Sequence, residues 1–222
     1  MLTIAEEKLL NNNNIFKHKT NNEIIGKGSF GTVFIGYNKD NSKMYGVKKI
    51  KKHLVNTYSI DNEVNVLLYI NKMCNTNLID KSNINVIELI NDIKKDDIRF
   101  LVFPLYGYNL YEYQRLIRFS PIPISICKII AKDIIDGIDF LHNKCQLIHR
   151  DLKLENIVFK NYTEEVSKKN CNIVIIDLGW AMFKDGAKCQ AEKVDVNANA
   201  NANADANANA NANANANANA NA

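Results

Sequence analysis

The sequence has no apolar run that approaches the about 18–20 residues needed to cross a bilayer, and it has no secretion signal. It has no CxxC pair and no metal-ligand spacing among its five cysteines, which favours reduced thiols over a disulfide framework or a zinc site. Basic and acidic residues are interspersed, with a net charge of +4, which favours a solvated surface over a nucleic-acid-binding one. We therefore expect an intracellular protein, cytoplasmic or nuclear, with no membrane and no direct nucleic-acid partner.

The composition otherwise indicates a globular domain with an unusual end. Apolar residues make up 46% of the chain and charged residues 23%, which is ordinary for a globular protein. Residues 197–222, however, alternate Asn and Ala almost perfectly, and this alternation has no apolar periodicity suited to a core. We expect a disordered low-complexity tail there, whose alanines raise the apolar fraction without adding to a core.

The first half of the chain favours strands around a single helix. Residues 1–21 are polar and are expected to form an extension outside the core, with a capping box from Thr3 to Glu6 starting one short helix. Short β-branched and aromatic segments then alternate with turn residues, and one segment with helical spacing lies among them. The expected strands are 23–25, 32–37, 44–50, 85–90 and 98–103, and the expected helix is 59–71.

The second half favours helices. A short amphipathic helix is expected over 108–119, and a longer one over 125–142 has one apolar stripe. The polar loop 149–156 follows, and then two short apolar runs, 157–159 and 172–176, on either side of a polar insertion. Five strands with one helix, followed by a helical half with a polar loop, predict a two-lobed α+β fold.

A glycine loop lies between the first two predicted strands. Gly26, Gly28, Gly31 and Val33 match the pattern GxGxxGxV, in which glycines let the backbone approach phosphate oxygens. Alone the motif is weak, because an ordinary glycine-containing hairpin explains it equally well. A dinucleotide-binding site would need a helix after the third glycine, but a β-branched and aromatic run follows. A Walker A loop is excluded because no Gly-Lys-Ser/Thr ends the motif.

A lysine and a glutamate are expected to pair across the first half. Alternate strand residues point to opposite faces, so Lys48 and Lys49 cannot both face a nucleotide, and the spacing from the glycine loop favours Lys48. Glu63 falls in the apolar sector of the predicted helix, where a carboxylate is costly without a cationic partner. Lys48 is the expected partner, whereas Asp61 and Asn62 are expected to face solvent. The alternative is that both lysines are ordinary surface residues.

Four polar residues carry the strongest functional signal. Asp151, Lys153 and Asn156 lie in one short loop, and Asp177 follows in an Asp-Leu-Gly sequence after an apolar run. These are the residue types that phosphoryl transfer from Mg·ATP requires.

With these motifs the chain resembles the eukaryotic protein kinases over roughly residues 22–183. The resemblance implies an N-lobe (22–103) with a five-stranded antiparallel sheet and one helix, a hinge (104–107), and a partial helical C-lobe (108–183). Residues 184–196 would begin an activation segment or linker. It also implies that Asp151 orients the attacking hydroxyl and accepts its proton, Lys153 neutralises the transferred phosphoryl group, and Asn156 and Asp177 hold Mg²⁺. The position of Lys153 resembles serine/threonine kinases rather than tyrosine kinases.

The resemblance also places the purine of ATP. Phe103 is similar to the gatekeeper residue, so the carbonyl of Pro104 and the N–H of Tyr106 would bind adenine. Four further residues would enclose the ring: Ile25, Val33, Gly46 and Val158. The chain departs from the family pattern in three places that should spare the chemistry, with Gly46 for alanine, Leu154 for proline and Leu178 for phenylalanine.

Some segments are more specifically similar to the CDC2-like, or LAMMER, kinases, which phosphorylate Ser/Arg-rich splicing factors. These are 105–113, the end of the long helix at 138–142, and the insertion after residue 160. Arg150 is a departure, because that subgroup carries threonine at this position.

After Gly179 the sequence does not continue as the family does. Only residues 180–196 precede the Asn-Ala tail, so we expect a truncated kinase chain without the usual peptide-binding platform. Two other hypotheses stay open. One is a nucleotide-binding pseudokinase or regulatory fragment, and the other assigns the function to the Asn-Ala repeat as an antigenic or self-associating segment.

Overall fold

The computed structural model describes residues 2–18, 24–40, 42–76, 79, 84–161, 166–167 and 171–185. All of them lie in one compact unit, Met1–Cys189. The predicted tail and nearly all of the predicted segment 184–196 lie outside the described residues, as do most of the insertion after residue 160 and Glu23 of the first predicted strand.

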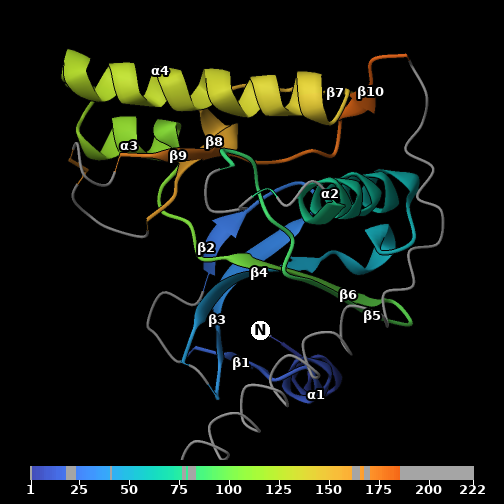
Figure 1. Ribbon diagram of the computed structural model, residues 1–222. Coiled ribbons are helices and arrows are strands. Elements are labelled where there is room, and N and C mark those ends of the chain that lie inside the picture. Colours follow the sequence, from blue (N-terminus) through green and yellow to red (C-terminus); the bar gives the residue numbers. More distant parts are fainter. Residues whose placement is uncertain are drawn as a thin grey trace, which may run out of the picture. The chain divides into compact units, whose positions relative to one another are not determined.

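An antiparallel sheet dominates the first half of the chain (Figure 1). Its strand order is β1-β3-β4-β6-β5, and β2 pairs with the other end of β3. The strands are β1 (Ile15–Lys17), β2 (Ile24–Lys27), β3 (Gly31–Asn38), β4 (Met44–Ile50), β5 (Asn91–Lys95) and β6 (Ile98–Pro104). The α+β fold predicted from the sequence is confirmed.

The central strands are buried on both faces because successive side chains point to opposite sides. In β6, Phe100 and Val102 pack into the core on one face, whereas Leu101 and Phe103 pack into the core on the other. In β4, the side chain of Val47 likewise points to the face opposite to that of Lys48. This explains why the segment 98–103 is almost continuously apolar.

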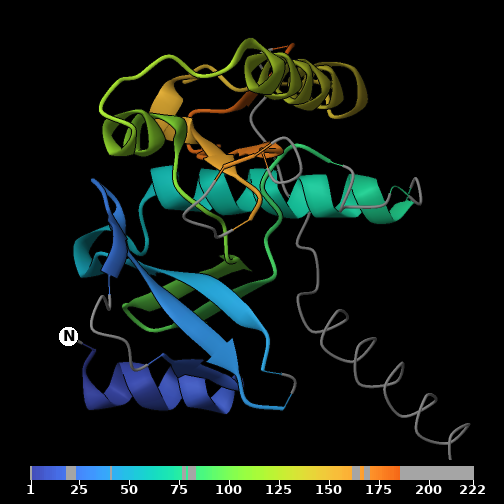
Figure 2. The same ribbon diagram turned by 90° about the vertical axis from the view of Figure 1, so that its left-hand side faces the viewer.

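A helix covers each face of the sheet (Figures 1 and 2). Helix α2 (Tyr58–Thr76) buries Ile60, Val64 and Leu67 in the core that also holds Leu101. Helix α1 (Ile4–Asn12) buries Leu10 against the opposite face. Its N-terminus has the predicted capping box, in which Thr3 and Glu6 each accept a hydrogen bond from the other's backbone N–H.

The prediction that residues 1–21 lie outside the core is wrong for the described part of this segment. Leu10 is 1% exposed and Ile15 is 5% exposed, and β1 adds a sixth strand to the sheet. The segment is polar on average, but two well-spaced apolar residues are enough to attach it to the sheet.

The strand predicted over 85–90 is also wrong. These residues form an isolated bridge at Val86 to Ile175 and no strand, and the strand that pairs with β6 is the more polar β5 that follows. Val86, Ile87 and Leu89 are apolar because they fill the core beneath α2. Only Ile93 of β5 is buried, as expected of an edge strand.

The described part of the second half contains two α-helices and two short pairs of antiparallel strands. Helix α3 (Leu110–Leu116) begins at a capping box of Asn109 and Glu112, and α4 (Ile124–Asp139) continues into a π-helical turn (Phe140–Lys144). Strand β7 (Leu147–Ile148) pairs with β10 (Met182–Phe183), and β8 (Ile157–Phe159) pairs with β9 (Ile173–Ile175).

The buried face of α4 determines where the polar loop can lie. Ile126, Ile130 and Leu141 of the predicted stripe are buried. Asp133 on the same helix is 5% exposed and accepts hydrogen bonds from Asn172 and from the backbone N–H of Ile173, each at 3.0 Å. The carboxylate therefore anchors β9, and with it the chain that leads to Asp177, against α4.

No helix among the described residues is long and apolar enough to span a membrane.

Packing of α1 on the sheet gives a testable prediction. We expect Leu10→Ala to lower the free energy of unfolding by about 2–5 kcal/mol, because it leaves a cavity against the sheet. The control is Ile4→Ala in the same helix, where the side chain is 88% exposed and the expected change is within about 0.5 kcal/mol. Urea denaturation measures both, and equal effects of the two variants would contradict the placement of α1.

Candidate active site

Lys48 and Glu63 meet between the sheet and helix α2, as predicted. The Lys48 Nζ atom lies 2.7 Å from Oε1 and 2.9 Å from Oε2 of Glu63, and the two side chains are only 17% and 6% exposed. Lys49 points to the other face of β4, where its Nζ lies 2.7 Å from Glu6 of α1. Burial raises the pKa of Glu6, but the hydrogen bonds from Lys49 and Thr3 outweigh burial and leave that pKa below its ordinary value.

Helix α2 is held in place by a second charged group. Arg99 of β6 contacts Asp92 of β5 at 2.7 and 2.8 Å and Asp61 of α2 at 2.6 Å. Burial lowers the pKa of Arg99, but its bonds to the two carboxylates outweigh burial and raise the pKa above its ordinary value. The prediction that Asp61 and Asn62 simply face solvent is wrong. Asp61 is bound to Arg99, and Asn62 donates to the carbonyls of Gly179 and Ala181.

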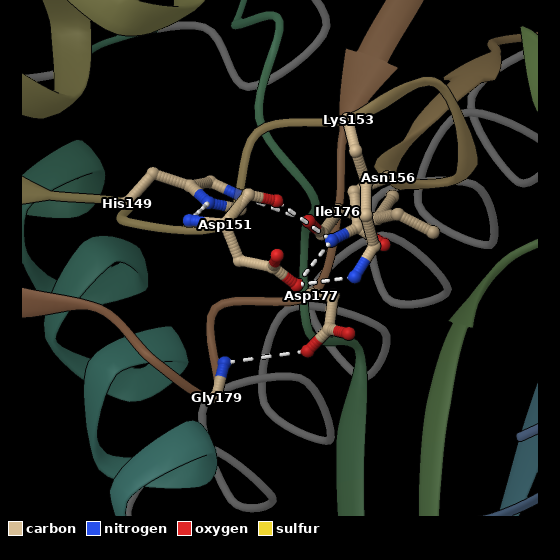
Figure 3. Close-up of polar contacts among 7 residues, drawn as sticks. All are labelled: His149, Asp151, Lys153, Asn156, Ile176, Asp177 and Gly179. Carbon is tan, nitrogen blue, oxygen red and sulfur yellow. Dashed lines mark hydrogen bonds and ion pairs between the residues drawn. The ribbon is translucent and has the colours of Figure 1, made fainter. Parts of the chain in front are cut away.

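The polar loop brings three of the predicted residues together (Figure 3). Oδ2 of Asp151 lies 2.6 Å from Nζ of Lys153 and 3.0 Å from Nδ2 of Asn156, which also donates to the carbonyl of Asp151. The hydrogen bond from Lys153 lowers the pKa of Asp151. The same bond, together with the nearby carboxylate of Asp177, raises the pKa of Lys153. Asp151 is therefore ionised at neutral pH and acts as a hydrogen-bond acceptor.

His149 joins this loop to the segment before Asp177, a role that the sequence analysis did not assign. Its Nδ1 accepts from the backbone N–H of Asp151 at 3.2 Å, and its Nε2 lies 2.9 Å from the carbonyl of Ile176. These partners require the neutral tautomer with a proton on Nε2, because a carbonyl only accepts. Ile176 also donates its backbone N–H to the carbonyl of Asn156. The only sequence signal was a histidine beside the apolar pair Leu147–Ile148.

Asp177 lies in a tight turn directly after this junction. Its φ of 63° is in the left-handed region, and Oδ1 accepts from the N–H of Gly179 at 3.4 Å. A Cβ atom at Gly179 would lie 3.3 Å from this oxygen, so a side chain there would press on the carboxylate. Arg150, also left-handed with φ of 68°, donates from Nε to the carbonyl of Trp180 at 2.6 Å. The segment after Asp177 is thus bound to the polar loop.

The glycine loop adopts the predicted strand–turn–strand form between β2 and β3. Gly31 is required by packing, because a Cβ there would lie 2.1 Å from the carbonyl oxygen of Lys49. A Cβ at Gly28 would meet no atom of the described residues within 4 Å, and one at Gly26 would only touch Val33 at 3.5 Å. The described chain therefore gives no steric reason for the first two glycines. Phe30 lies over Lys48, with the Nζ atom 5.8 Å from the ring centre.

Several of the predicted purine-binding residues are also brought together. Gly46 pairs with Phe103 across the sheet, and a Cβ at Gly46 would lie 3.6 Å from the carbonyl of Pro104 and 3.8 Å from Val33. Phe103 and Val158 are buried in one core, and Tyr106 packs against that core. Burial raises the pKa of the Tyr106 hydroxyl, which accepts from the N–H of Glu88. Ile25 lies half-buried in β2.

The oxygen donors at this site suit a hard cation such as Mg²⁺. The amide nitrogen of Asn156 is bound to Asp151, so its oxygen is the atom that can act as a ligand, alongside the carboxylate of Asp177. The described residues contain no group of three or more His, Cys, Asp or Glu that could hold an ion alone. Mg²⁺ typically takes one or two protein ligands and completes its shell with phosphates and water, so these residues fit that ion.

Two hollows in the described surface lie elsewhere and contain none of the predicted site residues. One, of about 280 Å³, lies beside α4, and the other, of about 360 Å³, lies at the open ends of β3 and β4. The candidate site therefore rests on its side-chain chemistry and not on the shape of a cavity.

Comparison with known proteins identifies the family of the chain. The family model of the protein kinase domain matches residues 19–198. The probable serine/threonine-protein kinase clkA of Dictyostelium discoideum is 28% identical over 186 residues, covering 72% of this chain and 20% of the relative. Homeodomain-interacting protein kinase 4 of Homo sapiens is 30% identical over 162 residues, covering 72% of this chain and 24% of the relative.

Serine/threonine-protein kinase 33 of Mus musculus is 27% identical over 173 residues, covering 75% of this chain and 32% of the relative. The chain therefore spans between about a fifth and a third of the length of these relatives. Since the family model covers most of the sequence, the chain belongs to the protein kinase domain family.

Proposed function

We propose that this chain is an ATP-dependent protein serine/threonine kinase, which transfers the γ-phosphoryl group of ATP to a protein hydroxyl. The observation that carries the proposal is the junction at Ile176, where His149 and Asn156 bind both backbone polar groups of one residue. This junction joins the loop that carries Asp151 to the residue directly before Asp177, which supports a role for both carboxylates in positioning the reactants.

The first half of the chain would hold the nucleotide. Bound Mg·ATP supplies the electrophilic phosphorus and a charge that offsets the phosphate oxygens. Lys48, fixed by Glu63, would bind the α- and β-phosphates, and the backbone around Gly26 and Gly28 would cover them. Asn156 and Asp177 would hold the metal ion.

The polar loop would act on the acceptor hydroxyl. The Asp151 carboxylate is a weak base because its pKa is lowered by Lys153. Its main contribution is therefore to orient the hydroxyl, and it accepts the proton as the new oxygen–phosphorus bond forms, the bond from the γ-phosphorus to the β-phosphate oxygen breaks and ADP leaves. Lys153 provides a positive charge within 2.6 Å of that carboxylate and would stabilise the transferred group.

We also propose the domain limits drawn from the sequence, with an N-lobe over 22–103, a hinge over 104–107 and C-lobe residues over 108–183. The N–H of Gly107 donates to the carbonyl of Phe159 in β8. This bond supports a hinge here, because the backbone stops pairing with the sheet after Pro104 and then bonds to β8. For the substrate we propose a basic, Ser/Arg-rich protein, on the basis of the LAMMER-like segments.

The first prediction from this proposal concerns Asp151. We expect Asp151→Asn to lower phosphate transfer from radiolabelled ATP to a Ser/Arg-rich peptide by at least about 100-fold, because the asparagine amide cannot accept the proton. Nucleotide binding should stay within about threefold of the parent chain, because Asp151 does not contact the nucleotide in this scheme.

The parent chain is the positive control, and mass spectrometry of the product identifies the modified residue. ATP binding without Asp151-dependent transfer would overturn the enzymatic proposal and would favour a nucleotide-binding regulatory domain. No binding of Mg·ATP at all would overturn both.

The glycine loop offers a matched pair of variants. We expect Gly31→Ala to lower the free energy of unfolding by about 1–3 kcal/mol, because its Cβ would collide with the Lys49 carbonyl. Gly28→Ala should leave the unfolding of the free chain unchanged but reduce the rise in melting temperature that ATP produces. The proposed role of this loop is wrong if Gly28→Ala leaves the ATP-induced rise intact.

The purine site can be tested at Gly46. Gly46→Ala should bind ATP normally, because its Cβ would make ordinary contacts at 3.6 and 3.8 Å. Gly46→Ile should keep the strand folded but fill the space proposed for the purine, which lowers ATP affinity by at least about tenfold. Calorimetric titration with ATP measures both variants, and normal affinity in Gly46→Ile would place the purine elsewhere.

A further inference from the structure

Gly179 forms hydrogen bonds through both its backbone N–H and its carbonyl, and these bonds join helix α2 to the candidate metal site. Its N–H donates to Oδ1 of Asp177 at 3.4 Å, and its carbonyl accepts from Nδ2 of Asn62 at 3.3 Å. One residue therefore links the carboxylate of Asp177 to the helix that carries Glu63. Asn62 and Glu63 are adjacent, so any shift of this turn of α2 moves both groups.

Asn62 is well matched to its position. A side-chain amide has two N–H donors, and two carbonyls lie within reach of Nδ2, those of Gly179 at 3.3 Å and Ala181 at 3.4 Å. Both carbonyls lie in the segment directly after Asp177, where the backbone N–H of Ala181 donates to the carbonyl of Leu178.

The rest of this segment is fixed from other directions. Phe183 packs edge-on against Tyr69 of α2 with ring centres 5.1 Å apart, and β10 pairs with β7. Arg150 binds the carbonyl of Trp180. Asn62 therefore contacts the turn next to Asp177 from α2 and Arg150 contacts it from the polar loop, whereas Tyr69 and β7 hold the far end of the segment.

We propose that Asn62 is a positioning residue that couples the Lys48–Glu63 pair to the metal-binding carboxylate of Asp177 through Gly179. The inference rests on the proposed function and adds a residue to it. In this arrangement, helix α2 in its observed position orients Asp177 for the cation, and a cation at Asp177 stabilises α2 in return. The coupling between the position of α2 and the affinity of Asp177 for the cation is reciprocal, because both effects arise from the same coupling free energy.

Removal of the Asn62 side chain is therefore expected to weaken the dependence of ATP binding on Mg²⁺. Without Asn62, the nucleotide still meets Lys48 and the glycine loop, so metal-free binding of ATP is retained. The additional affinity that Mg²⁺ provides falls, because Asp177 is less well oriented. The expected fall is about three- to tenfold, which corresponds to the loss of one or two ordinary hydrogen bonds.

The experiment compares Asn62→Ala with Asn71→Ala in the whole chain. Asn71 lies on the same helix and also donates from Nδ2 to a backbone carbonyl, that of Leu89 at 2.7 Å, but it does not contact the turn after Asp177. Calorimetric titration gives the Kd of ATP with Mg²⁺ and with a chelator, and the readout is the chelator value divided by the Mg²⁺ value. We expect the ratio to fall three- to tenfold in Asn62→Ala and to stay unchanged in Asn71→Ala.

Asn62→Leu is a second variant, with a similar shape, good helix propensity and no donor, and it should behave as Asn62→Ala does. A ratio within twofold of the parent value in both Asn62 variants overturns this inference and leaves the proposed function standing. An equal fall in Asn71→Ala also overturns it, because the effect would then be a general loosening of α2. If the parent chain shows no metal-dependent ATP binding, the proposed function fails and this inference fails with it.

Discussion

A carboxylate that is only 5% exposed on an apolar helix face needs a cationic partner, and this requirement at Glu63 organises the first half of the molecule. The partner, Lys48, lies on the face of β4 that points toward α2, so the ion pair fixes the register of the helix over the sheet. Arg99 and Asp61 hold the same helix through a second charged contact. On the opposite face of β4, a second ion pair joins Lys49 to Glu6 of α1.

In the second half, the backbone hydrogen bonds of one residue organise the structure around the polar loop. Ile176 donates to the carbonyl of Asn156 and accepts from His149, and both partners belong to the polar loop. Asp133 anchors the preceding strand β9 to α4. The candidate catalytic and metal-binding carboxylates therefore depend on buried polar groups that are fully paired, an arrangement that makes a site rigid.

The sequence predicted the contact between Lys48 and Glu63, but it did not predict every strand. Residues that carry unusual chemistry, such as Glu63 in an apolar stripe, leave a signal in the sequence because their burial needs an explanation. The apolar run 85–90 gave the wrong strand, since apolar content reports burial and not pairing. The N-terminal segment was missed because Leu10 and Ile15 are too few to raise the average hydropathy. Asn62 gave no signal and His149 gave only a weak one, since the contacts of an ordinary polar residue depend on the atoms that it meets in the folded chain.

The sequence by itself determined the family, because the protein kinase pattern restricts residue types and spacing along single loops such as 149–156. It also predicted which lysine of β4 faces Glu63, because alternation along a strand allows only one of the two and the spacing from the glycine loop favours Lys48. Only the tertiary structure decided that α1 packs on the sheet, that β5 and not 85–90 forms the edge strand, and that α2 reaches the turn after Asp177. These outcomes depend on contacts between residues far apart in the chain, and their energies do not exist until both partners are in place.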